Sequence, residues 1–199
     1  MRKAMLLFGT LAGIIFFTTV YVLAANVPDY SHLSDTVSEI GEIGSPVETV
    51  YKSGMLAAHL STVLFGIGLL LFSRNKKISA APAVLVTFYG LVGIGTALFP
   101  SPHPAHNLFG LAMVIGYMAP LALAIAWRGS EPLRTQTRIS WVVAALILVS
   151  IFLNISPLFT RDLFPLEYYG VVQRSAFVLF YGWLAVTGFQ CRQQQSLID

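Results

Sequence analysis

Four histidines are the residues of this 199-residue chain whose side chains are best suited to acid–base or metal chemistry. His103 and His106 form a His-Pro-Ala-His segment, His59 lies within an apolar stretch, and His32 lies in a polar segment. A zinc site needs three or four such ligands, normally at recognisable spacings. His-x-x-His bent by Pro104 differs from the His-Glu-x-x-His of a zinc helix. All four histidines are therefore metal candidates, but they form no established metal motif.

His59 and His106 have further possible roles. Two histidines on facing helices can hold a b-type haem, and a histidine can act as acid or base on a lipid ester or phosphate. A simpler role for His59 is a hydrogen bond to another helix, for example to Asn154, Thr96 or Tyr181. No Gly-x-Ser-x-Gly elbow holds a serine nucleophile, so we assign no catalytic residue. We expect no cofactor, with zinc and haem as the alternatives.

Arg174 is the second feature that calls for a partner. It lies beside Gln173, about one turn inside the last apolar stretch, where an unpaired guanidinium costs roughly 3 kcal/mol. An arginine this near the interface can extend its head group to water. The alternative is an ion pair with an acidic residue of the first long loop, namely Glu39, Glu42 or Asp35.

The elements that position these residues are expected to be membrane helices. Apolar residues make up 56% of the chain, charged residues 11%, and the mean hydropathy is +0.73, far from the values of soluble domains. Continuous apolar runs of about 20 residues predict helices rather than barrel strands. We therefore predict an all-α, single-domain bundle over 1–199 with six transmembrane helices, at about 5–25, 50–73, 80–99, 108–127, 139–158 and 170–190.

Charge sets the expected orientation. Nine of the twelve basic residues flank the spans on one side, which the positive-inside rule makes cytoplasmic. They are Arg2, Lys3, Arg74, Lys76, Lys77, Arg128, Arg134, Arg138 and Arg192. The opposite side receives seven of the nine acidic residues: Asp29, Asp35, Glu39, Glu42, Glu48, Asp162 and Glu167. We predict an inner-membrane protein with both termini cytoplasmic, and the pI of 9.1 then indicates no nucleic-acid partner.

The N-terminal stretch also resembles a signal peptide, since Arg2 and Lys3 precede an apolar run that ends near the small residues Ala24 and Ala25. The run is longer than a typical signal-peptide core, so we expect it to be retained as the first span. The one cysteine, Cys191, excludes an internal disulfide.

Small residues and prolines within the spans indicate how the helices pack. Glycine lets membrane helices approach closely, and Pro120 is expected to kink the fourth span without ending it. The glycines assigned this packing role are Gly90, Gly93, Gly95, Gly110 and Gly116.

The first outer loop is expected to be partly helical. Its apolar residues Val37, Ile40 and Ile43 are spaced for one or two helical turns lying on the bundle. Thr36-x-x-Glu39 has the pattern of a capping box, and Gly41 or Gly44 suits the end of such a turn.

The chain as a whole resembles the DUF998 family of bacterial and archaeal membrane proteins. The likeness rests on six spans, on Tyr30-Ser31-x-x-Ser34-x-x-x-Ser38-Glu39-Ile40-Gly41, on Phe99-Pro100 followed by His106, and on Gly170-x-x-Gln173-Arg174. The Ser-Glu-Ile-Gly segment is distantly similar to the FRAG1/DRAM/Sfk1 membrane family. The resemblance implies that Ser38, Glu39, Gly41, His106, Gln173 and Arg174 recur. Ser101-Pro102-His103 departs from the family pattern, which often has an acidic residue there.

These observations predict an outward-facing polar pocket that binds a lipid headgroup or a small polar ligand. Its expected binding residues are Ser38, Glu39, His59, His106, Gln173 and Arg174, with Glu39 and Arg174 setting its charge. The alternatives are a metal-dependent hydrolase acting on a lipid, a b-haem protein, or a transporter, which the uncharged cytoplasmic halves of the spans make less favoured. Membrane lipids are the expected partners, and the oligomeric state stays open.

Overall fold

The computed structural model describes residues 2–130, 133–160 and 163–196, and within these ranges the secondary structure is helical, with no strand. The α-helices are α1 (Arg2–Met5), α2 (Phe8–Ala24), α3 (Glu48–Lys76), α4 (Ala81–Leu98), α5 (Pro104–Gly116), α6 (Ala119–Ala126), α7 (Arg134–Ile155) and α8 (Tyr169–Ser196). Three short 3-10 helices complete them: η1 (Val37–Gly41), η3 (Ser156–Leu158) and η4 (Leu166–Tyr168). The predicted all-α class is confirmed.

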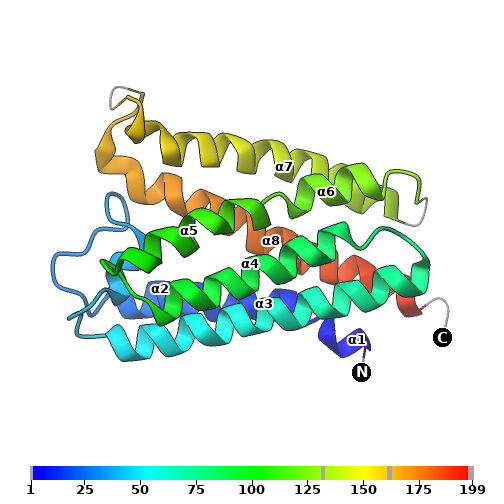
Figure 1. Cartoon of the computed structure of the whole chain (residues 1–199), viewed down its shortest axis with the longest axis horizontal. Coiled ribbons are helices and arrows are strands. Elements are labelled where there is room, and N and C mark those ends of the chain that lie inside the picture. Colours follow the sequence, from blue (N-terminus) through cyan, green and yellow to red (C-terminus); the bar gives the residue numbers. More distant parts are fainter. Residues whose placement is uncertain (1, 131–132, 161–162, 197–199) are drawn as a thin grey trace.

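Within the described residues, five helical segments are long and apolar enough to cross a membrane, as expected of a multi-pass membrane protein. They are Lys3–Ala24, Glu48–Lys76, Ala81–Leu98, Pro104–Ala126 and Arg134–Ile155. α8 is not in this set, although its 28 residues give it a length of about 42 Å at 1.5 Å per residue. It runs the length of the bundle behind α4 and α5 (Figure 1).

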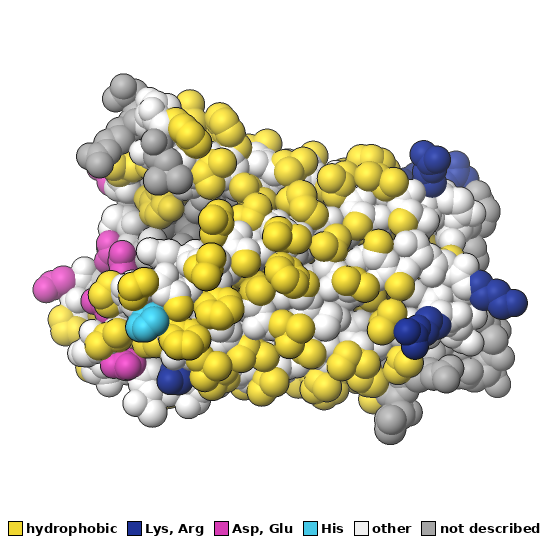
Figure 2. Space-filling model, in the orientation of Figure 1, with side chains coloured by type: hydrophobic (Ala, Val, Ile, Leu, Met, Phe, Trp, Pro, Cys, Tyr) yellow, Lys and Arg dark blue, Asp and Glu magenta, His cyan; other side chains and the backbone are white. Residues whose placement is uncertain are grey.

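The bundle is built by sequential packing of neighbouring helices and closed by α8. α2 packs on α3, α3 on α4 and α4 on α5, while α8 contacts α7, α2 and α3. Large aromatic side chains fill the interior, among them Phe65, Tyr89, Trp127 and Trp183, each at most 1% exposed. The exposed apolar side chains of the exterior form a broad band between the two ends of the molecule (Figure 2).

Glycines account for the close helix contacts, with one exception. A Cβ added to Gly90 would meet Val63, and one on Gly116 would meet Tyr89. Gly93 and Gly95 are similarly crowded, by His59 and Phe109. The packing role predicted for Gly110 is wrong, because nothing lies within 4 Å of a Cβ added there.

The fourth span is interrupted at its centre, where the sequence predicts only a kink at Pro120. α5 ends at Gly116 and α6 begins at Ala119, so Pro120 falls in the first turn of α6. Proline has no N–H to donate to the Gly116 carbonyl, and its ring crowds that carbonyl. α6 packs on α7, whereas α5 packs mainly on α4 and diverges from α7 (Figure 1).

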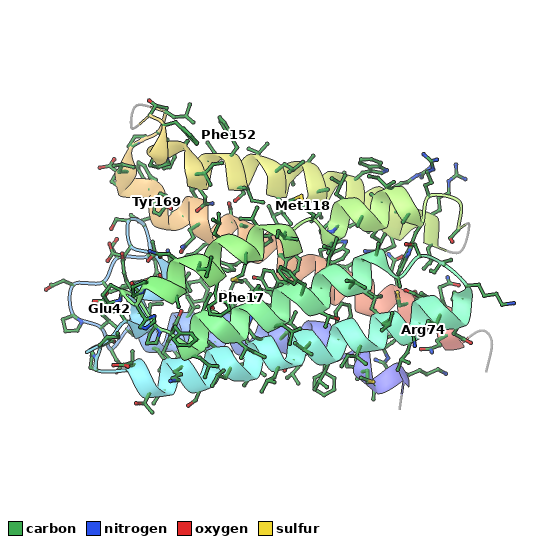
Figure 3. The ribbon with its side chains drawn as sticks, viewed as in Figure 1. Phe17, Glu42, Arg74, Met118, Phe152 and Tyr169 are labelled. Atoms are coloured by element: carbon green, nitrogen blue, oxygen red, sulfur yellow. The ribbon has the colours of Figure 1, made fainter. Side chains whose placement is uncertain are left out.

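Charge separates the two ends of the bundle. We call the end with residues 25–47, 99–103 and 156–160 the acidic end, and the end with residues 74–80 and 127–130 the basic end. Acidic side chains gather at the first and most basic ones at the second (Figure 2). Glu42 and Arg74 mark the opposite ends in Figure 3. Asp162, which the sequence assigns to the acidic side, lies outside the described residues.

Candidate functional site

The loop at the acidic end folds over the bundle as the sequence predicts. Val37 and Ile40 are buried in η1, and the Glu39 carboxylate accepts the Thr36 N–H at 2.9 Å, which is the capping role. Ile43 departs from the prediction, since it is exposed while its N–H donates to the Ser101 carbonyl at 2.8 Å. The loop is therefore held to the α4–α5 turn by a backbone hydrogen bond.

Two glycines allow the loop to fit. Gly44 has a φ of 91°, a left-handed conformation that side chains disfavour. A Cβ on Gly41 would overlap the ring of Tyr51, whose hydroxyl donates to the Val37 carbonyl at 2.8 Å. The recurrence of Gly41 that the resemblance implies has a steric reason here.

Arg174 anchors the same loop to α8. Its Nη1 donates to the carbonyls of His32 at 2.9 Å, Asp35 at 2.8 Å and Gly170 at 2.8 Å, and its Nη2 donates to the Tyr30 hydroxyl. Arg174 is only 7% exposed. The predicted ion pair with Glu39, Glu42 or Asp35 is wrong for the described residues, because carbonyl oxygens of the loop take the place of a carboxylate.

Gln173 ties η1 to α8 beside this anchor. Its Oε1 accepts the Val37 N–H at 2.7 Å, and two residues earlier the Val171 N–H donates to the Leu33 carbonyl at 3.1 Å. Val171, Gln173 and Arg174 of α8 thus hold both ends of the segment 32–37.

Electrostatics in the loop follow from burial and from this guanidinium. Burial raises the pKa of Tyr30 to about 12, although Arg174 acts in the opposite direction. Burial and then Arg174 lower the pKa of His32, since both disfavour the imidazolium. Hydrogen bonds from the Ser31 N–H and the Ser34 hydroxyl lower the pKa of Asp35.

Beneath η1 lies a cavity of about 200 Å³ in the half of the bundle nearer the acidic end. It is lined by residues of α2, η1, α3, α4, α5, α7 and α8, most of them apolar. Its polar lining comprises Ser38, Tyr51, His59, Thr96, His106, Tyr117, Asn154 and Gln173. Four of the six predicted binding residues are therefore brought together, while Glu39 and Arg174 do not line this cavity.

His106 enters the cavity wall in a fixed orientation. Its Nδ1 lies 2.9 Å from the Phe99 carbonyl and 3.1 Å from that of Thr96. A carbonyl only accepts, so Nδ1 carries the proton and Nε2 of the neutral ring is an acceptor. This nitrogen makes no hydrogen bond within the described part of the chain.

His59 lies deeper and is only 2% exposed. Its ring packs against Gly93 and lies 6.0 Å from the Tyr89 ring, measured between centroids. Nδ1 has no hydrogen-bond partner among the described residues, so the predicted bond from this atom to Asn154, Thr96 or Tyr181 is not formed. A buried polar atom without a partner is rare in native structures.

Asn154 and Gln173 present opposite hydrogen-bonding groups. The Asn154 Nδ2 donates to the carbonyls of Ser150 at 2.8 Å and Val172 at 3.2 Å, which leaves Oδ1 as a free acceptor. Because the Oε1 of Gln173 is taken by Val37 N–H, its Nε2 is a free donor. These assignments do not depend on a choice of amide flip, since each backbone partner can only donate or only accept.

The histidines do not converge on one point. His103 lies at the start of α5, where its Nδ1 accepts the Ala105 N–H at 3.1 Å, and His32 lies in the loop between the rings of Tyr21 and Tyr30. No group of three or more histidine, cysteine or carboxylate residues suited to a metal occurs within 2–130, 133–160 and 163–196.

The family model described as "Protein of unknown function (DUF998)" matches residues 10–190, which include the loop, the cavity and the Arg174 anchor. The chain belongs to this family. No curated protein and no solved structure matches the DUF998 chain.

Several polar residues of this DUF998 site are not among the binding residues predicted from the sequence, and Asn154 and Tyr30 are two of them. Asn154 was assigned only as a partner for His59, and Tyr30 only as part of the family pattern. A signal for Asn154 was present, because a polar amide within an apolar span needs partners or a cavity. Tyr30 had no such signal, since aromatic residues are common near membrane interfaces.

Proposed function

We propose that this DUF998 protein binds the polar head of a membrane lipid in the cavity beneath η1. In this proposal the chain crosses the inner membrane six times, has both termini in the cytoplasm, and exposes its acidic end outside the cytoplasm.

The observation that carries the proposal is a set of uncommitted polar groups in an otherwise apolar cavity. His106 Nε2, Asn154 Oδ1 and Gln173 Nε2 belong to residues that line the cavity and have no hydrogen-bond partner among the described residues. A ligand site is typically apolar with a few convergent polar groups of this kind. A lipid head supplies the missing partners while its chain contacts the apolar walls.

The orientation is supported by the distribution of charge. Basic residues are concentrated at the end of the bundle where α3 and α6 terminate and where both described chain ends lie (Figures 1 and 2). The positive-inside rule makes such an end the cytoplasmic face. α8 is long enough to cross the hydrocarbon layer, and its one basic residue near the acidic end, Arg174, donates hydrogen bonds to the loop through Nη1 and Nη2. These features favour a sixth span.

The predicted binding residues then divide into two roles. Ser38, His59, His106 and Gln173 line the cavity and are proposed to contact the ligand. Glu39 and Arg174 are proposed to act as positioning residues, because they hold η1 and residues 30–37 over the cavity.

Gly110 offers a direct test of lipid binding. It lines the cavity and has no atom within 4 Å of an added Cβ, so the backbone accepts a side chain there and Gly110→Leu is expected to occupy part of the site. We expect native mass spectrometry of the purified wild-type protein to detect a retained lipid, and Gly110→Leu to lose it. Gly182→Leu is the matched control, because Gly182 also has open space around it but does not line the cavity. Equal lipid retention by all three proteins would refute the proposal.

A further inference from the structure

We infer that the lipid bound in this cavity has an uncharged, hydroxyl-bearing head, and that its apolar chain leaves the bundle sideways between α5 and α7. This inference rests on the proposed function and adds the class of ligand and its path.

The first argument is the absence of fixed charge. No aspartate, glutamate, lysine or arginine is among the described residues lining the cavity. The nearest guanidinium, that of Arg174, already donates to three carbonyls and the Tyr30 hydroxyl. A phosphate or an ammonium group would therefore enter the cavity without a counter-charge, which is strongly unfavourable in an apolar environment.

The second argument is the match of hydrogen-bonding groups. Two acceptors of the lining are free, His106 Nε2 and Asn154 Oδ1. Two donors are free as well: Gln173 Nε2, and the Tyr117 hydroxyl, which accepts from Tyr89 and has no acceptor of its own among the described residues. A phosphate oxygen only accepts and would face two acceptors. A hydroxyl group both donates and accepts, so one or two hydroxyl groups satisfy this set.

The third argument is the position of the cavity relative to α5 and α7. Gly110, Met113 and Val114 of α5 and Ile151 and Ile155 of α7 all contribute to its lining. Yet α5 does not pack extensively on either α7 or α8 in the described chain, because the break before Pro120 directs only α6 onto α7. The cavity is thus only partly enclosed, and α5 and α7 flank its membrane-facing side.

The volume of the cavity also indicates that the lipid chain leaves between α5 and α7. Sites for drug-sized ligands occupy roughly 300–1,000 Å³. A cavity of about 200 Å³ holds a small head and the first part of a chain. The remainder of the chain then lies between the exposed apolar side chains Leu111 of α5 and Leu148 of α7, in contact with surrounding lipid.

Two lipids that differ only in a phosphate give the sharpest test. We expect 1-oleoylglycerol to bind at least about tenfold more tightly than 1-oleoylglycerol-3-phosphate, a difference of roughly 1.4 kcal/mol. Binding is measured by native mass spectrometry of the full chain in an amine-oxide detergent, which carries no hydroxyl group to compete.

Asn154→Leu tests the hydrogen bond itself. Loss of one acceptor should weaken 1-oleoylglycerol about five- to tenfold. Asn26→Leu is the matched control, because Asn26 Nδ2 makes a similar hydrogen bond to the carbonyl four residues earlier but is exposed in the loop. Unchanged binding in Asn154→Leu would contradict the inferred contact.

The outcomes separate this inference from the proposed function. Preference for the phosphate-bearing lipid, abolished by Gly110→Leu, would overturn the uncharged head but keep lipid binding. Binding of neither lipid, together with no lipid retained from the membrane, would overturn both. Tight binding of 1-oleoylglycerol that Gly110→Leu leaves intact would overturn the path between α5 and α7.

Discussion

Arg174 shows how one buried charge can organise a loop without an acidic partner. Three carbonyl oxygens around one nitrogen orient their negative ends toward the guanidinium, and those of His32 and Asp35 belong to the loop that it anchors. The fork of donors in arginine suits this arrangement, whereas lysine concentrates its charge on one nitrogen. The loop 30–37 therefore depends on the geometry of the guanidinium as well as on its charge.

We predict that Arg174→Gln lowers the free energy of unfolding by about 3 kcal/mol, because several buried carbonyls lose their donor. Arg174→Lys should recover only part of this loss. The measurement is thermal and denaturant unfolding in detergent micelles, with the exposed Arg138→Gln on α7 as the control. Equal unfolding of Arg174→Gln and wild type would remove the anchoring role.

His32 makes the stability of the loop depend on pH. Its pKa is lowered from 6.5 in the folded protein, so its contribution to stability is full above about pH 6.5 and is lost as the pH falls through the lowered pKa. The lowered pKa of Asp35 acts in the same direction, below its ordinary value of 3.8. Protonated His32 also places a positive charge beside Arg174.

We therefore predict that residues 30–37 lose hydrogen-exchange protection between pH 7 and pH 5, after correction for intrinsic exchange rates. His32→Gln should show little change over this interval, while Asp35 stays ionised throughout it. Protection that falls equally in His32→Gln and wild type would assign the effect to another group.

At the scale of helices, the sequence predicts most of the architecture because the hydrocarbon layer imposes a length and a composition. Five of the expected spans recur, with boundaries shifted by a few residues. The fourth begins at Pro104 rather than near 108, since proline suits the first turn of a helix. The capping box of Thr36 and Glu39 was predictable because its two residues are only three apart in the sequence.

Contacts that use the backbone were not predictable. Any residue supplies a carbonyl, so nothing in the sequence marks His32, Asp35 and Gly170 as the partners of Arg174. The shape of the cavity could not be predicted from the sequence either, because it depends on how far α5 diverges from α7. Of its polar members, His59 could be named because a polar group is costly within a membrane, whereas Ser38, His106 and Gln173 follow from the resemblance to DUF998.

The break at Pro120 is the element-level cause of that divergence. We predict that Pro120→Ala restores the hydrogen bond to the Gly116 carbonyl, brings α5 nearer to α7, and reduces lipid retention. Leu111 and Val149 are both exposed and can be replaced by spin-labelled cysteines. Double electron–electron resonance should then report a shorter distance between the two labels in Pro120→Ala. The native Cys191 is buried.

Pro82→Ala is the control for this substitution, because Pro82 lies in the first turn of α4, where no helix hydrogen bond is lost. A label-to-label distance unchanged by Pro120→Ala would mean that neighbouring helices, rather than the proline, maintain the divergence.

For the whole molecule, the separation of charge and the apolar band together define a direction across the membrane. Glu42 and Asn75 are both exposed; Glu42 precedes the span Glu48–Lys76, and Asn75 lies in the last turn of that span, at its other end. Gln193, exposed near the end of α8, should lie on the same side as Asn75 only when α8 crosses the membrane. These three positions therefore test orientation and the number of spans in one experiment.

We predict that a membrane-impermeant maleimide applied to intact cells labels Glu42→Cys but neither Asn75→Cys nor Gln193→Cys, in a Cys191→Ala background. After the membrane is permeabilised, all three should react, because each side chain is exposed. Labelling of both Glu42→Cys and Gln193→Cys in intact cells would mean five spans, with α8 lying within the bundle without crossing. Labelling of Asn75→Cys and Gln193→Cys alone would keep six spans but reverse the orientation, and would place the loop that Arg174 anchors in the cytoplasm.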